Sequence, residues 1–180
     1  SISVVIPAYN YAHLLPRALD SVLGQWAADL ELIVVNDGSR DNTTEVLAAY
    51  AARYPQLRVI EQANAGAAAA RNHGIRLARG LYALLLDADD ELLPTALSSL
   101  RDVLASNPDA GLVLGSQLSV TPDGRERLRL PTPASGAPYQ LIQRYLLDKK
   151  ISISHCCTLF RRDLLLQRPY PESLRSGEDI

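Results

Sequence analysis

The sequence is poor in several residue types, and each shortage removes a class of protein from consideration. It contains 0 methionines and only 2 cysteines among 180 residues. The two cysteines, Cys156 and Cys157, are adjacent, so they match no spaced metal-binding motif, and a disulfide between them would be strained. We therefore expect them to be buried thiols in a reducing compartment.

Long apolar segments and an excess of charge are also missing. No apolar run approaches the roughly 18 residues of a membrane-spanning helix, and the N-terminus has no signal-peptide pattern. The 18 basic and 20 acidic residues give a net charge of −2, which provides no electrostatic footprint for nucleic acid. Because the chain lacks methionine and starts directly in a strand-like run, we expect a trimmed or excised piece. Peripheral membrane association through missing segments stays open, as does the oligomeric state.

The signatures of several enzyme classes are not found. The chain has no G-x-G-x-x-G, no phosphate loop ending in Gly-Lys-Ser/Thr, no G-x-S-x-G and no H-E-x-x-H. Dinucleotide oxidoreductases, standard ATPases, serine hydrolases and zinc proteases are therefore disfavoured. The three histidines lie far apart in sequence and are each expected to be structural or surface residues rather than ligands: His13, His73 and His155.

What the sequence does contain is a regular alternation of strand and helix patterns. Of its residues 47% are hydrophobic, and a chain of this length can bury roughly 70% of its unfolded surface, so one self-sufficient domain is expected. Strands are predicted at 2–6, 30–35, 57–61 and 81–86, each followed by a helical pattern. This alternation predicts right-handed βαβ units and an α/β fold with a parallel sheet.

Punctuating residues set the expected ends of the helices. Asn10 is an expected N-cap of the first helix, and Asp41 or Asn42 of the second. Pro16 is tolerable only within a first turn. Gly80 is well placed as the left-handed cap that ends the third helix.

The pattern changes after residue 111, where short strands predict a different second half. A strand at 112–118, a turn at 122–124 and a strand at 125–130 predict a hairpin. Its arginines alternate and share one face, which favours a solvated edge strand over a grip on an anionic substrate: Arg125, Arg127 and Arg129. Further on, the sequence predicts a loop at 131–138, a helix at 139–147, a strand at 155–160 and a last helix from 161.

The segment after the fourth strand organises the chain. The uncharged, mostly apolar run at 81–86 stops at four carboxylates within five residues: Asp87, Asp89, Asp90 and Glu91. Open α/β sheets bind ligands beyond the carboxyl ends of their strands, where these acids would lie. Asp87 and Asp89 share one side of an extended chain, which suits a hard divalent cation. An acidic loop ahead of the next helix is the alternative.

Polar side chains also follow the other three strands: Asn10 the first, Asp37 the second and Asn64 the third. Any one of them is an ordinary turn residue, but all of them fall at the edge where ligands bind. Asp37 could accept a hydrogen bond from a base or a ribose hydroxyl. Arg71 could stack on a base or hold a phosphate, although a helix-surface ion pair is the preferred interpretation from the residue alone.

Four motifs occur in order at suitable intervals: Val5-Ile6-Pro7-Ala8-Tyr9-Asn10, Val34-Val35-Asn36-Asp37-Gly38-Ser39, Asn64-Ala65-Gly66 with Ala70-Arg71-Asn72, and Leu85-Leu86-Asp87-Ala88-Asp89-Asp90. The ordered set resembles the family 2 inverting glycosyltransferases of GT-A fold, over nearly the whole chain. The resemblance implies a Rossmann-like, mostly parallel central sheet flanked by helices. It implies a single domain over 1–180, with a nucleotide-sugar-binding half at 1–117 and an acceptor-side half at 118–180. Family members usually continue further, so this domain is expected to be incomplete at its C-terminus.

The resemblance also implies roles for individual residues. Asp89 would be the direct ligand of Mn²⁺ or Mg²⁺, with Asp87 facing the ribose and the metal. Asp179 would be the general base, with Glu178 as its neighbour. The implied donor-binding residues include the base-holding Pro7-Ala8-Tyr9 loop, Asp37 and Arg71, and the full set is Pro7, Ala8, Tyr9, Asn10, Asp37, Asn64, Gly66, Arg71, Asp87, Ala88 and Asp89.

The implied reaction is a metal-dependent, inverting transfer of a sugar from a nucleotide diphosphate, expected to be a UDP-sugar, to a hydroxyl of a saccharide or glycolipid. Its usual setting is bacterial cell-surface polysaccharide or glycolipid synthesis at the cytoplasmic side of the membrane. One alternative is a sugar-nucleotide nucleotidyltransferase, which would carry a Gly-rich, basic stretch in place of residues 7–10. A non-catalytic nucleotide-binding module is the other.

Overall fold

The computed structural model describes residues 1–131 and 154–173 of the chain. Within these residues the main sheet has six strands in the order β3-β2-β1-β4-β8-β5. Four of them are parallel: β1 (Ile2–Ala8), β2 (Leu30–Asp37), β3 (Leu57–Gln62) and β4 (Tyr82–Leu85). Two short strands extend the sheet beyond β4, and β8 (Thr158–Arg161) runs antiparallel to both of its neighbours, β4 and β5 (Leu112–Leu114). The mostly parallel sheet predicted from the sequence is confirmed.

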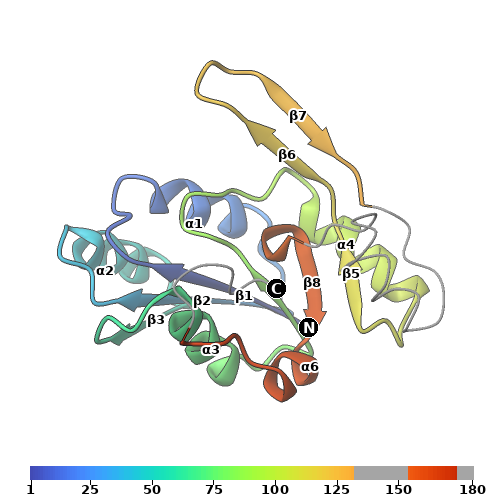
Figure 1. Cartoon of the computed structure of the whole chain (residues 1–180), viewed down its shortest axis with the longest axis horizontal. Helices are drawn as coiled ribbons and strands as arrows, with labels where there is room; N and C mark the ends of the chain where they lie inside the picture. Colours follow the sequence, from blue (N-terminus) through green and yellow to red (C-terminus); the bar gives the residue numbers. More distant parts are fainter. Residues whose placement is uncertain (132–153, 174–180) are drawn as a thin grey trace.

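Helices cover both faces of this sheet (Figure 1). One face carries α1 (Leu15–Leu23), α2 (Thr43–Arg53) and α4 (Ala96–Ser106). The opposite face carries α3 (Ala67–Leu77) and α6 (Arg162–Gln167). Within the described ranges no helix is long and apolar enough to cross a membrane.

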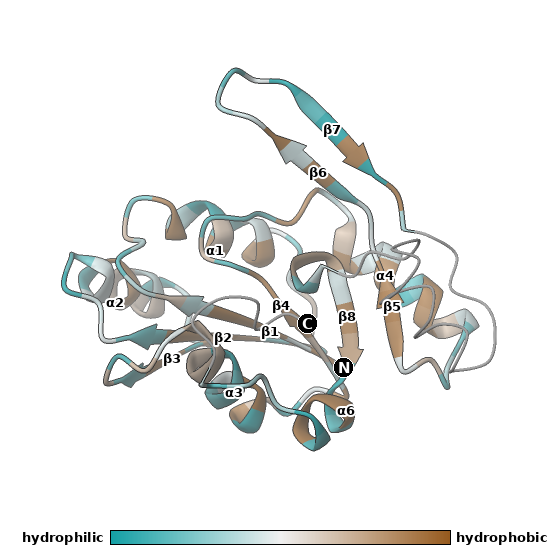
Figure 2. Cartoon of the chain, viewed as in Figure 1, coloured by the Kyte–Doolittle hydropathy of each residue, from teal (hydrophilic) through white to brown (hydrophobic). Residues whose placement is uncertain are grey.

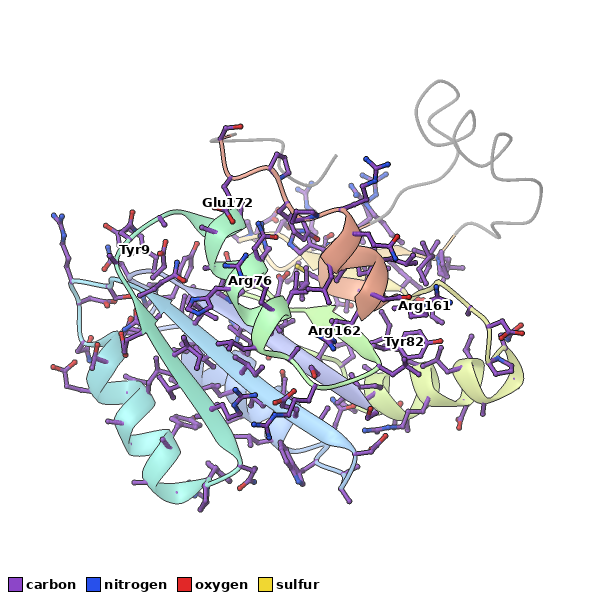
Figure 3. All side chains as sticks on the ribbon, turned by 90° about the horizontal axis from the view of Figure 1, so that it is seen from below. Tyr9, Arg76, Tyr82, Arg161, Arg162 and Glu172 are labelled. Atoms are coloured by element: carbon purple, nitrogen blue, oxygen red, sulfur yellow. The ribbon has the colours of Figure 1, made fainter. Side chains whose placement is uncertain are left out.

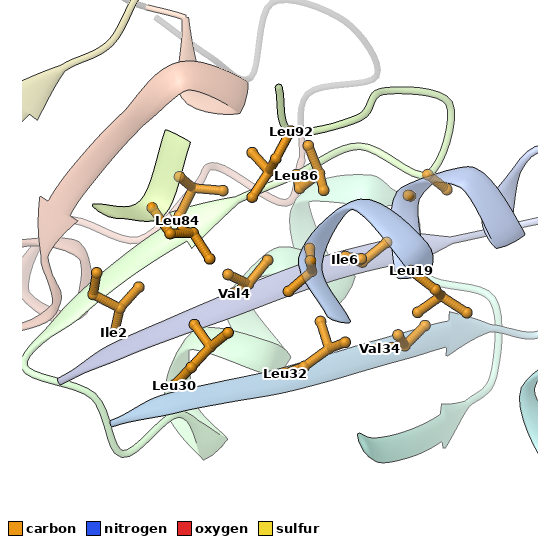
Figure 4. Packing of buried hydrophobic residues seen from close by; sticks show 14 of the residues in the cluster. Ile2, Val4, Ile6, Leu19, Leu30, Leu32, Val34, Leu84, Leu86 and Leu92 are labelled. Carbon is orange, nitrogen blue, oxygen red and sulfur yellow. The ribbon is translucent and has the colours of Figure 1, made fainter. Parts of the chain in front are cut away.

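The alternation of side chains along each strand builds a separate core on each face. On β1, Ile2, Val4 and Ile6 pack under α1, as Figure 4 shows, whereas Val5 faces α3 on the other side. The hydrophobic residues run along the strands of the main sheet in Figure 2. Each fully buried side chain such as Leu19 stabilises the fold by about 1.5–3 kcal/mol relative to an exposed one. The two cores fix the strand ends that carry the polar residues.

The predicted hairpin is confirmed, but the strand ahead of it is divided. Strands β6 (Gln117–Val120) and β7 (Glu126–Arg129) pair antiparallel and project from the main sheet (Figure 1). The single strand expected at 112–118 is wrong, because β5 ends at Leu114. Gly115 follows it and lies close against the Cys157 backbone: its N–H bonds to the Cys157 carbonyl at 2.7 Å, and an added Cβ would lie 2.7 Å from the same oxygen.

Two predicted helix caps are also wrong. Asn10 does not cap α1, which begins at Leu15 with Pro16 in its first turn, as tolerated. Helix α3 ends at Leu77, and Gly80 is not in the left-handed conformation. Gly80 instead allows a close approach to β1: its N–H donates to Ser3 Oγ at 2.9 Å, and an added Cβ would lie 2.6 Å from the Ser3 nitrogen.

The C-terminal part of the described chain differs slightly from the prediction. Residues His155–Cys157 form a short 3-10 helix, η1, and the strand begins only at Thr158. The last helix is confirmed as α6. The helix predicted at 139–147, and all but Pro131 of the loop predicted at 131–138, lie outside the described residues.

Candidate functional site

The carboxyl ends of the parallel strands meet at one edge of the sheet, and a pocket of about 450 Å³ opens there. Residues at or just beyond the ends of β1, β2, β3 and β4 form its wall together with the first turns of α3. Tyr11, Ala67 and Ala70, which were not predicted, also line it. The structure brings together here every predicted donor-binding residue except Asn10: Pro7, Ala8, Tyr9, Asp37, Asn64, Gly66, Arg71, Asp87, Ala88 and Asp89.

Asn10 lies just outside this pocket and joins two loops instead. Its backbone is left-handed, with φ of 58°. Its side-chain Oδ1 accepts a hydrogen bond from the Arg40 N–H at 2.7 Å, and its own N–H donates to Ser39 Oγ at 2.9 Å. Asn10 therefore fastens the loop after β1, which contributes Tyr9 and Tyr11 to the pocket wall, to the loop after β2.

The carboxylate of Asp37 holds the far wall of the pocket in place. It is buried and accepts hydrogen bonds from the backbone N–H groups of Ala65 and Gly66, each at 2.8 Å. The side-chain amides of Gln62 and Asn64 donate to it at 2.8 and 3.3 Å. Buried carboxylates need such donors. Asp37 thus ties the end of β2 to the segment that enters α3.

Tyr9, labelled in Figure 3, lines the pocket and is 39% exposed. It follows β1, whose last residues Pro7 and Ala8 form part of the wall. An aromatic ring with one face open to solvent offers a surface on which a planar group can stack.

At the base of the pocket, Arg71 and Asp87 form a buried ion pair. Nη2 of Arg71 donates to Oδ1 of Asp87 at 2.9 Å, and the two side chains are 6% and 29% exposed. Arg71 is thus not in the helix-surface ion pair that its position on α3 suggested. Burial alone would raise the pKa of the Asp87 carboxyl, but the contacts with His155 and Arg71 outweigh it and hold that pKa well below its usual range.

Two residues of this site were missed from the sequence. Nε2 of His155 lies 3.0 Å from Oδ2 of Asp87 and 3.2 Å from Nη2 of Arg71, and the thiol of Cys156 lies 3.3 Å from the same Asp87 oxygen. Because a carboxylate only accepts hydrogen bonds, Nε2 carries the proton in its contact with Asp87. No local pattern could reveal this, since His155 is 68 residues from Asp87 and reaches it through the antiparallel insertion of β8 beside β4.

The ligand atoms of Asp87, His155 and Cys156 lie within 4.8 Å of one another and form a candidate metal-binding group. Burial, followed by the charge of Asp87, raises the pKa of the Cys156 thiol and disfavours the thiolate that a soft metal needs. Because Nε2 of His155 carries a proton towards Asp87, the donors that stay available are carboxylate oxygens. This set suits Mn²⁺ or Mg²⁺ better than a thiolate-bound metal.

Asp89 presents the third carboxylate of the pocket, after Asp37 and Asp87, and is exposed to solvent. Among the described residues, its only hydrogen-bond partner is the Tyr11 hydroxyl at 3.5 Å, and no lysine or arginine pairs with it. The charge of Asp89 raises the pKa of Tyr11, so this phenol stays a neutral donor. An open carboxylate facing a pocket is the chemistry that a hard divalent cation requires.

A second, larger cavity of about 760 Å³ adjoins the pocket and shares Asp89 with it. It lies between α4 and the β5–β6 segment, and its walls are largely apolar: Leu100, Val103, Val113, Leu118 and Val120 are among them. Asp90 and Glu91 lie on its wall as well. The predicted pair Glu178 and Asp179 lies outside the described residues.

A parallel sheet with a pocket beyond its strand ends is the arrangement found in α/β nucleotide-binding proteins. The sequence matches the family described as "Glycosyl transferase family 2" over residues 3–168. This chain belongs to glycosyltransferase family 2.

Relatives with curated descriptions include two proteins of Escherichia coli. The chain is 46% identical over 99 residues to the uncharacterized glycosyltransferase YibD of strain K12, a match that covers 55% of this chain and 29% of YibD. It is 35% identical over 178 residues to a chondroitin synthase, which covers 99% of this chain and 25% of the synthase. The chain therefore spans less than a third of the length of either relative.

Two solved structures show the same fold. Residues 1–349 of TarS from S. aureus superpose with a TM-score of 0.78 at 23% identity, covering 99% of this chain and 52% of that one. The mannosyltransferase PcManGT from Pyrobaculum calidifontis, in complex with GDP-Man and Mn²⁺, superposes with a TM-score of 0.70 at 23% identity. This match covers 96% of this chain and 48% of PcManGT. The expected GT-A fold is confirmed.

Proposed function

We propose that this chain transfers a sugar from a nucleotide-diphosphate donor, a UDP-sugar, to an acceptor hydroxyl with inversion at the anomeric carbon. The observation that carries the proposal is the pocket at the strand ends, which gathers ten of the eleven expected donor-binding residues. TarS has been crystallised with UDP and with UDP-GlcNAc, and PcManGT with GDP-Man, which supports a nucleotide-sugar donor.

The wall of the pocket would bind the nucleoside. Tyr9 offers its ring to one face of the base, and the segment held by Asp37 offers polar groups to its edge. Arg71 brings a positive charge to the base of the same pocket, where it suits a polarised base or a phosphate oxygen. Nucleoside and diphosphate would therefore lie along the line from Tyr9 to Asp89.

Asp89 would hold Mn²⁺ or Mg²⁺, with Asp87 next to it on the side of the ribose. When bound, such an ion stabilises the negative charge that develops on the departing diphosphate. The pKa of Asp87 is well below its usual range, so this carboxylate stays ionised at neutral pH and holds Arg71 in place. The Mn²⁺ in the PcManGT complex supports a divalent cation at this kind of site.

In the proposed reaction the acceptor oxygen attacks the anomeric carbon from the face opposite the diphosphate. The bond from that carbon to the diphosphate oxygen breaks, and the acceptor proton passes to a carboxylate base. A sugar hydroxyl is a weak nucleophile, and a positioned base contributes about 10²–10⁴-fold. Asp179 is the proposed base, with Glu178 beside it in the chain.

The larger cavity beside Asp89 is the proposed place of the acceptor, a saccharide or a glycolipid. It adjoins the donor pocket at the residue where the metal would bind, so an acceptor hydroxyl there could reach the anomeric carbon. The setting that accompanies this proposal is bacterial cell-surface polysaccharide or glycolipid synthesis at the inner face of the membrane. The chondroitin synthase relative supports a role in polysaccharide synthesis.

The test is a thermal-shift panel of UDP, GDP, ADP and CDP, each with Mn²⁺ and with a chelator. We expect one base to stabilise the chain, by about 2.7 kcal/mol at 100 times its dissociation constant. Asp89→Ala should abolish the metal-dependent part, whereas Asp102→Ala on the exposed surface of α4 should leave it unchanged. Equal shifts for every nucleotide, indifferent to chelator, would overturn the proposal. Release of pyrophosphate from a nucleoside triphosphate would instead favour a nucleotidyltransferase.

A further inference from the structure

The segment that follows α6 presents a tyrosine between two prolines, Pro169-Tyr170-Pro171. Proline fixes its own φ, restricts the residue before it and has no backbone N–H. The tripeptide is therefore stiff, and the N–H of Tyr170 is its single backbone donor. A contact that captures this N–H sets the position of the whole tripeptide.

Asn72 of α3 makes that contact from both sides. Its Oδ1 accepts the Tyr170 N–H at 2.9 Å, and its Nδ2 donates to the Tyr170 carbonyl at 2.9 Å. Nδ2 also donates to Oε1 of Glu172 at 2.9 Å. Asn72 is buried, so one side chain pairs with the backbone of Tyr170 as a neighbouring strand would. Figure 3 shows Glu172 of this segment close to Arg76 of α3.

These hydrogen bonds place the ring of Tyr170 against Arg71, the residue before Asn72. The guanidinium carbon of Arg71 lies 5.7 Å from the centre of the Tyr170 ring, within the range of a cation–π contact. Nη2 of the same guanidinium reaches Asp87 at the base of the pocket. Arginine has many rotamers, and packing against a ring reduces the number that it can adopt.

We propose that Tyr170 is a positioning residue for Arg71, and that Asn72 holds Tyr170 in place for this purpose. The Pro169-Tyr170-Pro171 tripeptide thus prepares the donor pocket without lining it, because none of its three residues is among those that line the pocket. The inference rests on the proposed function only in that Arg71 binds the donor. The contacts among Asn72, Tyr170 and Arg71 do not depend on that role.

The main test is isothermal titration of the full chain with UDP and with GDP, each in the presence of Mn²⁺. One of the two nucleotides should bind the wild type. Tyr170→Ala should lower the affinity for that nucleotide about tenfold, which corresponds to about 1.4 kcal/mol. Tyr170→Phe keeps the ring and its backbone pairing, so its affinity should stay within about twofold of wild type. Asn72→Ala, which releases the backbone of Tyr170, should weaken binding in the same direction.

Two matched controls separate positioning from general stability. Arg76→Ala removes the exposed ion pair to Glu172, 4.0 Å long, on the same segment and should leave affinity unchanged. Leu165→Ala removes a side chain from the core that Tyr170 packs against and should lower stability but not affinity. If Leu165→Ala and Tyr170→Ala weaken binding equally at equal loss of stability, Tyr170 has only a structural role and the inference is overturned.

A ligand-free measurement keeps the inference separate from the proposed function. In a double-mutant cycle of Tyr170→Ala with Arg71→Met, the two losses of unfolding free energy should not be additive, because the side chains are in contact. Additive losses would overturn the inference. If the wild type binds neither nucleotide, the proposed function fails, and this cycle still decides whether Tyr170 holds Arg71.

Discussion

Nη2 of Arg71, on α3, lies 2.9 Å from Oδ1 of Asp87, just beyond the end of β4, and the two side chains meet at the base of the donor pocket. Arg71 is almost completely buried, and the carboxylate of Asp87, which also contacts His155, stabilises its charge. Removing one partner of a buried pair leaves an uncompensated charge and costs more than removing both.

We expect Arg71→Met to lower the free energy of unfolding by about 2–3 kcal/mol, somewhat less than for a fully buried pair because Asp87 is 29% exposed. Urea unfolding at pH 7 measures this loss. The double variant Arg71→Met with Asp87→Asn should recover a large part of it, since no charge is then left unpaired. A double variant as unstable as the sum of the two single variants would contradict this account.

Gly38, which follows Asp37, should not tolerate a side chain. Its φ is +68°, and an added Cβ would lie 2.8 Å from the backbone nitrogen of Asn64. Gly38→Ala should therefore lower the free energy of unfolding by about 2–3 kcal/mol and weaken nucleotide binding. Gly124→Ala is the matched control in urea unfolding. The φ of Gly124 is +78°, but an added Cβ meets nothing within 4 Å, so Gly124→Ala should lower the free energy of unfolding by only about 1–2 kcal/mol. Equal losses for Gly38→Ala and Gly124→Ala would contradict the role of the Asn64 contact.

The acid stability of the fold should depend on Glu31 of β2. Its Oε2 accepts hydrogen bonds from Ser3 Oγ at 2.7 Å and from the Arg79 N–H at 2.8 Å, and Arg58 pairs with Oε1. Burial alone would raise the pKa of Glu31, but these donors together lower it. Because the pKa of Glu31 is lower in the folded state, its contribution to the free energy of unfolding is complete above the unfolded-state pKa of about 4.3. This contribution is lost as the pH falls through the folded-state pKa.

Urea unfolding between pH 7 and pH 3 tests the role of Glu31. The Glu31→Gln variant should be less stable at pH 7 and should lose less stability on acidification than the wild type. Glu45→Gln on the exposed surface of α2 serves as the control and should follow the wild-type curve. If the free energies of unfolding of the wild type and Glu31→Gln fall in parallel as the pH is lowered, Glu31 is not responsible for the loss of stability in acid.

Both cysteines should react slowly with alkylating reagents. Burial is the largest cause that raises the pKa of the Cys156 thiol, and the charge of Asp87 adds to it; burial also raises the pKa of Cys157. Because only the thiolate is nucleophilic, iodoacetamide at pH 8 should modify either cysteine more slowly than a free cysteine of pKa about 8.5. Mass spectrometry of native and urea-unfolded chain measures the two rates. Rapid modification of native chain would be inconsistent with the geometry around Asp87.

The sequence was sufficient for the parallel half of the fold because its signals are local. Apolar runs predicted β1 to β4, and the polar residues after the second, third and fourth runs predicted where the pocket forms. The same local signals failed where a distant segment decided the conformation. Gly80 is suited to a helix cap, but the close approach of Ser3 determines its role. At Gly115, just past the end of β5, the Cys157 carbonyl lies against the backbone and leaves no room for a side chain.

The residues of the candidate site show the same difference between local and distant signals. The acids and amides at the strand ends could be predicted, since neighbouring parallel strands bring their ends together. His155 and Cys156 could not, because nothing near them in the sequence resembles a site and they reach Asp87 only through β8. Arg71 was identified, but its burial was not, because burial depends on partners that lie elsewhere in the chain, among them Asp87, His155 and Tyr170.

The antiparallel insertion of β8 has a consequence for biosynthesis. Strand β4 has β1 on one side, but its other edge is completed only when Thr158–Arg161 leaves the ribosome. At about 5–20 residues per second, the seventy or so intervening residues take roughly 4–15 s to translate. During that interval the nascent chain exposes an unpaired apolar strand edge, which is a ready partner for aggregation or for a chaperone.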